Sequence, residues 1–335
     1  MANFLDKITS NTLYQKIPWS KLMAFAALVI LYLFFAYFGR YFVSVPTTLR
    51  ILASSYFVGF LAIGVTFVII TGGIDLSIGA VMITSSLVGA QLYRIHEWPL
   101  EAAIVVIMLT GMAFGLANGL MVTKLKLPPF IATLGTMLVA LGLGSIVTNV
   151  RTLRFPTGIG EDAWFRTLFL RTDNNFPSGA VFLAGYFIIA FILLNKTKFG
   201  RYVYAIGSNE EAARLSGVNT DKWKCLAFVF CGFSAGCAAI FFAAAYVTVV
   251  PNTGQGFELE AIAAVVIGGT SLAGGIGSLT GTMIGVFIMS TLGAGLVSMG
   301  IPAPFQVFFS GLVVIGAVLL DIQRTKRANQ VKKVK

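Results

Sequence analysis

Apolar runs of about twenty residues recur along the whole chain, and most of them carry no charge. One run, FVGFLAIGVTFVII at 57–70, is uncharged throughout. A membrane-spanning helix needs ~20 such residues, because in lipid every backbone N–H and C=O group must be paired within the segment. Charged residues make up 11% of the 335 residues, against about 25% in a soluble domain. The sequence therefore predicts an all-α integral membrane protein with a single transmembrane domain over 1–335.

We expect about ten transmembrane helices. The third and eighth predicted spans are short and interrupted by glycine, so either can be partly re-entrant. The first apolar run follows a long polar segment and is predicted to be a retained span rather than a cleaved signal peptide. The predicted spans are 22–43, 51–70, 76–93, 101–122, 128–147, 180–194, 226–247, 262–274, 277–299 and 306–320.

Basic residues are distributed unevenly between the two sides of the membrane. Every lysine falls in the tail 1–21, the turn after the fourth span, the connection 195–225 or the basic tail 321–335. Only arginines lie on the other side. The positive-inside rule makes the lysine side cytoplasmic, with both termini there. The net charge of +11 thus reflects orientation in a cell membrane and not nucleic-acid binding. The outer arginines are Arg40, Arg50, Arg94, Arg151, Arg154, Arg166 and Arg171.

A glycine pattern recurs in the fourth and ninth spans, and a Pro-Phe element follows each copy. Glycines four residues apart form a flat stripe on which a neighbouring helix can pack closely. Spans two to five and seven to ten then look like two copies of one unit in opposite orientation, an inverted repeat typical of transporters. Glycine-rich helices also recur in bundles without any repeat. The glycines are Gly111, Gly115, Gly119, Gly277, Gly281 and Gly285.

Asp75 is an ionisable residue in the middle of an apolar region, TGGIDLSIGAVM at 71–82. One interpretation is structural: Asp75 and Ser77 pair the free N–H groups of a helix break. The other is functional, since ionisable residues within a membrane usually face a cavity or a partner. A loose counterpart, VVIGGTSLAG at 265–274, has a serine but no acid. The candidate residues of the translocation pathway are Thr71, Gly72, Gly73, Asp75, Ser77, Thr270 and Ser271.

Glu258 and Glu260 precede the eighth span and are expected on the outer face. They either cap that helix, where acidic residues are favoured, or contact a partner protein. The three cysteines lie in one apolar run and are expected to be core residues. The sequence has no cluster of metal ligands, no nucleophile paired with a histidine and no nucleotide-binding motif. We therefore expect no cofactor on this chain and no catalytic activity.

The connection 195–225 is the longest cytoplasmic segment. Within it, SNEEAARLSG at 208–217 predicts a short helix with Ser208 or Asn209 as its N-cap and Gly217 at its end. This is either a solvated loop or a compact element that fits a groove of a partner protein.

Three segments together resemble the membrane permease subunit of bacterial ABC importers for ribose and related monosaccharides: TGGIDLSIGAVM, FGRYVYAIGSNEEAARLSGVN and FELEAIAAVVIGGTSLAGGIGS. The similarity covers residues ~50 to 320 in order. It implies a ten-span permease that works as a pair, either two identical chains or this chain with a paralogue. Two cytoplasmic ATP-binding subunits would drive it, holding ATP and Mg, and an external sugar-binding protein would deliver the substrate. This sequence has IDLSIG where many members of that family have IDLSVG.

The resemblance also implies that the cytoplasmic connection carries the coupling helix that docks onto the ATPase. Its residues would be Arg201, Gly207, Asn209, Glu211, Ala212, Ala213 and Gly217. The outer loop 151–178 matches no family motif, and the sugar is not legible from the sequence. The alternative function is that of a secondary transporter or channel, for which Asp75 is almost the only candidate coupling site. A membrane enzyme would need a reactive constellation, which the sequence lacks.

Overall fold

The computed structural model describes residues 19–171, 174 and 176–333. Most of the predicted tail 1–21 and the last two residues of the tail 321–335 lie outside the described residues. The regular elements of the described chain are helices except for two short strands, in agreement with the predicted all-α class. Its elements are α3 (Trp19–Phe38), α4 (Val45–Ile70), α5 (Ile78–Ile95), α6 (Leu100–Thr123), α7 (Pro129–Thr148), β1 (Leu153–Arg154), η1 (Glu161–Ala163), α8 (Trp164–Phe169), α9 (Ser178–Lys196), α10 (Lys198–Ser208), α11 (Glu210–Leu215), α12 (Thr220–Tyr246), β2 (Thr248–Val249), α13 (Phe257–Ile267), α14 (Leu279–Ser298) and α15 (Ala303–Lys333).

Nine helices of the described chain are long and apolar enough to cross a membrane. They correspond to the predicted spans except the eighth. The predicted span 262–274 is instead the 11-residue helix α13 followed by an irregular segment. Two glycines at 268–269 end α13, so the apolar run is too short to cross the membrane as one helix. The glycine interruption that the sequence indicated for the eighth span is therefore present, and α13 covers only the first part of that span.

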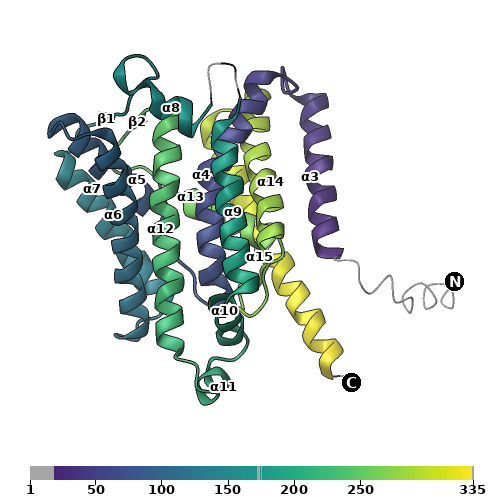
Figure 1. Cartoon of the computed structure of the whole chain (residues 1–335). Helices are drawn as coiled ribbons and strands as arrows, with labels where there is room; N and C mark the ends of the chain where they lie inside the picture. The colour runs from purple at the N-terminus through teal and green to yellow at the C-terminus, as the bar shows by residue number, and fades with distance from the viewer. Residues whose placement is uncertain (1–18, 172–173, 175, 334–335) are drawn as a thin grey trace.

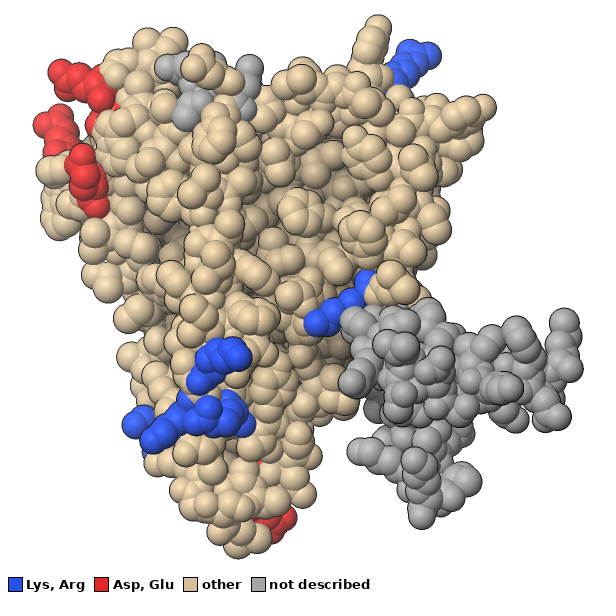
Figure 2. Space-filling view, turned by 45° about the vertical axis from the view of Figure 1, so that its right-hand side comes forward, with Lys and Arg blue, Asp and Glu red and all other residues tan. Residues whose placement is uncertain are grey.

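α4 and α12 form the centre of the bundle, and α3 stands at its edge (Figure 1). Most of α4 is buried, whereas most of α3 is exposed. α10 and α11 project from one end of the bundle, and β1, β2 and α8 lie at the other. On the face in Figure 2, Lys, Arg, Asp and Glu lie near the two ends, with a broad uncharged band between them. This distribution suits a bundle surrounded by lipid.

Glycines make the closest helix contacts of the core. Gly111 and Gly115 of α6 face Gly232 and Gly236 of α12, where a Cβ atom would overlap the opposite backbone. Gly119 packs on Cys225 in the same way. Backbone contact of this kind is the reason for small residues at four-residue spacing. In α14, Gly281 packs on the backbone of Gly268 and Gly285 on that of Ala264, and Gly277, which precedes α14, packs on the side chain of Ile70.

Candidate functional site: two helix breaks and a protruding helix

The first helix break, residues 71–77, joins α4 to α5 without regular structure. Thr71, Gly72 and Gly73 form the turn that ends α4. Gly72 has φ +83°, a conformation that glycine adopts at little cost. The Thr71 hydroxyl donates to the Val68 carbonyl at 2.7 Å. The sequence prediction of a helix interruption at this position is therefore correct in its geometry.

Asp75 lies inside this break and is 1% exposed. Its Oδ1 accepts hydrogen bonds from the backbone N of Ser77 at 2.9 Å and from the Ser77 hydroxyl at 2.6 Å. The carboxylate thus satisfies polar groups of the break, which is the role that the structural interpretation assigned to it. Direct contact of Asp75 with a substrate stays a prediction.

Two neighbouring helices hold the first break through polar side chains. Asn118 of α6 donates through Nδ2 to Ser77 Oγ at 2.9 Å and to Asp75 Oδ2 at 3.4 Å. Thr133 of α7 accepts from the backbone N of Leu76 at 3.1 Å. Sequence reasoning missed both residues. The sequence feature that could have indicated a role for Asn118 is that it is the single amide side chain in the glycine-rich run GLANGLMV.

The second helix break, residues 268–278, joins α13 to α14. Thr270 is buried and its Oγ1 accepts from the backbone N of Ser278 at 3.3 Å. Ser271 Oγ accepts from the backbone N of Ala273 at 3.3 Å. This break has no acidic residue of its own, but Asp321 of α15 supplies one. Its Oδ2 accepts from the backbone N of Leu272 at 3.1 Å, a contact that the sequence did not predict.

The two breaks lie side by side, because the backbone N of Gly275 donates to the carbonyl of Ile70 at 2.9 Å. Gly72 and Gly274 are also in contact. The proposed counterparts 68–77 and 265–274 therefore meet in the structure. Contact between two breaks does not by itself establish a repeat, so the inverted repeat stays a prediction.

α10 packs directly on both breaks. A Cβ atom on Gly207 would overlap the Ile70 carbonyl and the backbone N of Gly275. Tyr204 donates its hydroxyl hydrogen to the carbonyl of Gly277 at 2.9 Å. Arg201 lies on the exposed side of the same helix. The segment predicted to couple transport to a partner therefore contacts the irregular parts of the transmembrane region without an intervening element.

α11 is a short helix that protrudes from the bundle (Figure 1). Asn209 is its N-cap, because Asn209 Oδ1 accepts from the backbone N of Ala212 at 2.9 Å. Gly217 follows it with φ +82°, as expected for a helix-ending glycine. Glu210 forms an ion pair with Lys224 of α12 at 2.6 Å. Glu211 and Ala212 are exposed and Ala213 is buried, so one side of α11 is fixed and the other is free.

Glu258 and Glu260 lie in the first turn of α13. Glu258 is 6% exposed, so its side chain is not open to a partner protein, and its place on the outer side of the membrane stays a prediction. Its Oε1 accepts from the backbone N of Gly256 at 2.9 Å, and its other oxygen contacts the start of α5 at Gly79. The capping interpretation describes this geometry, because the carboxylate pairs a free N–H group beside the helix start.

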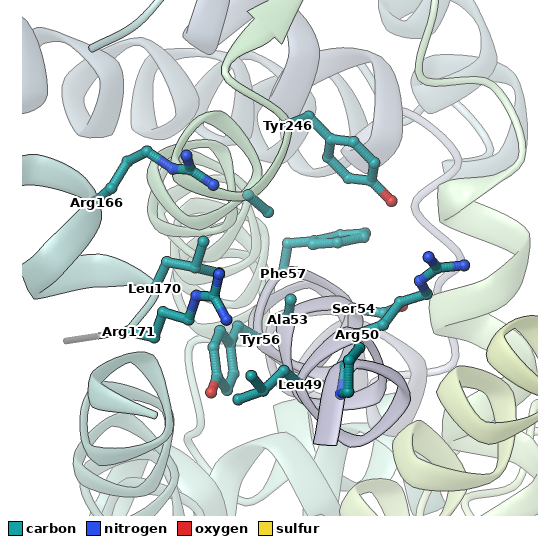
Figure 3. Close-up of a pocket in the computed structure, with 12 residues that line it drawn as sticks. Leu49, Arg50, Ala53, Ser54, Tyr56, Phe57, Arg166, Leu170, Arg171 and Tyr246 are labelled. Atoms are coloured by element: carbon teal, nitrogen blue, oxygen red, sulfur yellow. The ribbon is translucent and has the colours of Figure 1, made fainter. Parts of the chain in front are cut away.

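A pocket of about 360 Å³ opens at the end of the bundle away from α11. Figure 3 shows Arg166 and Arg171 on one side of it, Arg50 on the other and the Phe57 ring between them. Burial and the nearby Arg171 lower the pKa of Arg166. Arg166 Nε donates to the carbonyl of Ala244 at 2.9 Å. No Asp or Glu is among the lining residues, so the pocket offers aromatic rings and hydrogen-bond donors to a hydroxyl-rich or anionic group.

Residues 47–318 match the family described as branched-chain amino acid transport system / permease component. The chain is 38% identical over 305 residues to the ribose import permease protein RbsC of Bacillus subtilis (strain 168), covering 91% of this chain and 94% of the relative. It is 36% identical over 299 residues to RbsC of Escherichia coli (strain K12), covering 88% and 91%.

A third relative is the fructose import permease protein FrcC of Rhizobium meliloti, 35% identical over 290 residues and covering 84% of this chain and 79% of the relative. No solved structure matches the chain. The match over residues 47–318 contains both helix breaks, α10 and α11. The predicted resemblance is confirmed: the chain belongs to this family of transport-system permease components and is a multi-pass permease subunit of an ABC importer.

Proposed function

We propose that this permease subunit moves a monosaccharide or a related polyol into the cell. The support is the agreement among the relatives, two of which are named as ribose and one as a fructose import permease. We further propose that two ATP-binding subunits, holding ATP and Mg, supply the energy and that an external sugar-binding protein delivers the substrate. A second permease subunit, identical or paralogous, would complete the pathway.

The proposed orientation places α10, α11 and both termini in the cytoplasm. The positive-inside rule supports it, because every lysine lies in a tail or connection on that side. The arginine pocket of Arg50, Arg166 and Arg171 then faces outward. Its aromatic rings and guanidinium groups suit a ligand rich in hydroxyl groups at the entrance of the pathway.

The contact of α10 with both helix breaks is the observation that carries the proposed coupling to the ATP-binding subunits. An ATPase that binds the free side of α11 would move α10, because the two helices are joined at Asn209. Gly207 would transmit this movement to Ile70 and Gly275 by direct backbone contact. Energy supplied outside the membrane thereby reaches the two least regular segments inside it.

The proposal is tested by reconstitution into liposomes. The chain is incorporated with its co-expressed ATP-binding subunit, the binding protein is added outside, and ATP is enclosed. We expect uptake of radiolabelled ribose or fructose that needs both ATP and the binding protein. Uptake by the chain alone, driven by a sodium or proton gradient, would overturn the proposal in favour of a secondary transporter.

A further inference from the structure

A lipid-facing groove runs between α3 and α4 with α14 as its floor. α3 packs against α14 and hardly contacts α4. The groove has a volume of about 330 Å³ and is almost entirely apolar. Its walls include Leu28 and Tyr32 of α3, Leu52 of α4 and Phe287 of α14. An apolar groove at this depth, open to the surrounding bilayer, suits a hydrocarbon chain.

A second hollow, of about 530 Å³, lies farther toward the outer end of the same three helices, beyond the buried Phe42 ring that packs on Tyr32. It is lined by Arg40 after α3, Arg50 of α4 and Ser298 at the end of α14. The backbone N of Arg40 donates to the carbonyl of Ser298 at 2.9 Å, which holds Arg40 above the floor helix. The apolar groove and the hollow with its two guanidinium groups are thus neighbours along α4 and α14.

The two arginines lack an anionic partner within the described chain. None of the ion pairs found there includes Arg40 or Arg50, and the hollow has no Asp or Glu among its lining residues. Guanidinium groups bind phosphate oxygens with good geometry. A second copy of the chain on this groove, related by a two-fold axis, would bring its own Arg40 and Arg50 toward these two arginines. Repulsion between the like charges therefore favours an anionic occupant over a second copy.

We propose that the groove binds one anionic phospholipid of the outer leaflet. Its phosphate would lie between Arg40 and Arg50, and one acyl chain would lie along Leu28, Leu52 and Phe287. The lipid would lie between α3 and α4 beside the buried cluster of Phe35, Phe42 and Ile51. Because α4 leads into the first helix break and α14 follows the second, a bound lipid would stabilise both helices that adjoin the breaks.

The test is native mass spectrometry of the purified full-length chain after exchange into phosphatidylglycerol or phosphatidylcholine. We expect one retained phosphatidylglycerol and a roughly thirtyfold loss of its affinity in the double variant Arg40→Gln/Arg50→Gln. Arg40→Lys/Arg50→Lys should restore most of the binding, which shows that the fold is intact. Arg151→Gln, an outer arginine outside both hollows, should bind as the parent chain does.

The acyl-chain part of the site is tested with Leu28→Trp, which fills the groove. Ile30→Trp, on the exposed face of the same helix, is its control. We expect lipid retention to fall only in Leu28→Trp. Equal retention of both lipids, or undiminished phosphatidylglycerol binding in the Arg→Gln double variant, would overturn the proposal. Disulfide cross-linking of two Leu28→Cys chains would overturn it in favour of a second copy. These readouts measure binding and not transport, so they are independent of the proposed sugar import.

Discussion

The two helix breaks meet at one end of the bundle but are stabilised differently. The first contains its own acid, Asp75, which pairs with Ser77 and is held by Asn118 of α6. The second contains no acid and receives one from Asp321 of α15. The first break is therefore a local polar network, whereas the second depends on the position of a separate helix. We therefore expect a movement of α15 to affect the second break and to leave the first unchanged.

The substitution Gly207→Val should have the largest effect, because it acts on both breaks at once. The added side chain would push α10 away from Ile70 and Gly275. Overpacking of this kind costs about 1–3 kcal/mol, and we expect ATP-driven uptake to fall to background. Gly135→Val is the matched control, since a Cβ there meets no atom within 4 Å. Normal uptake by Gly207→Val would contradict the proposed transmission through α10.

The substitution Asp75→Leu should be the next most damaging. It leaves the Ser77 N–H and the Ser77 hydroxyl without their acceptor and removes one of the two acceptors of the Asn118 amide. We expect unfolding in detergent to require about 2–3 kcal/mol less free energy. Asp75→Asn keeps one acceptor oxygen and should retain most of the stability. If Asp75→Asn is stable but loses transport, the charge serves the pathway as well as the break.

The substitution Asn118→Leu tests whether α6 holds the first break alone. It removes the donor to Ser77 and Asp75 while leaving their mutual hydrogen bonds intact. We expect a loss of about 1–2 kcal/mol in the free energy of unfolding. Labelling of a cysteine introduced at Leu76 should become faster, and labelling at Leu272 should not change. Asn195→Leu, an exposed amide, is the control. Equal changes at both breaks would show that they open together.

The substitution Asp321→Leu should have the smallest effect on stability and the most selective effect on the breaks. It leaves the backbone N of Leu272 without its acceptor, at a cost of about 1 kcal/mol. We expect faster labelling at Leu272 and an unchanged rate at Leu76. Asp321→Asn should preserve the parent rates. If Asp321→Leu changes only Leu76, the assignment of this acid to the second break is wrong.

Most of the fold could be predicted from the sequence, because apolar length and helix caps are local signals. Nine spans, the cap at Asn209 and the end at Gly217 follow from them. The glycines of the eighth span indicated its interruption as well, but the contact of this break with the first one, from Gly275 to Ile70, could not be predicted. Asn118, Thr133 and Asp321 also could not be assigned to the breaks. Their partners lie more than 40 residues away in sequence, beyond the reach of any local pattern.

The glycine contact between α6 and α12 has a mechanical consequence. α12 has 27 residues, which makes it about 40 Å long, and it runs from the end of the α11 connection to the arginine pocket at Tyr246. Gly232 touches α6 near the middle of α12, and Cys225 and Gly236 touch it on either side, so the two helices are joined over about three turns. We therefore expect a displacement at the α11 end of this helix pair to move its other end, at Tyr246, with it.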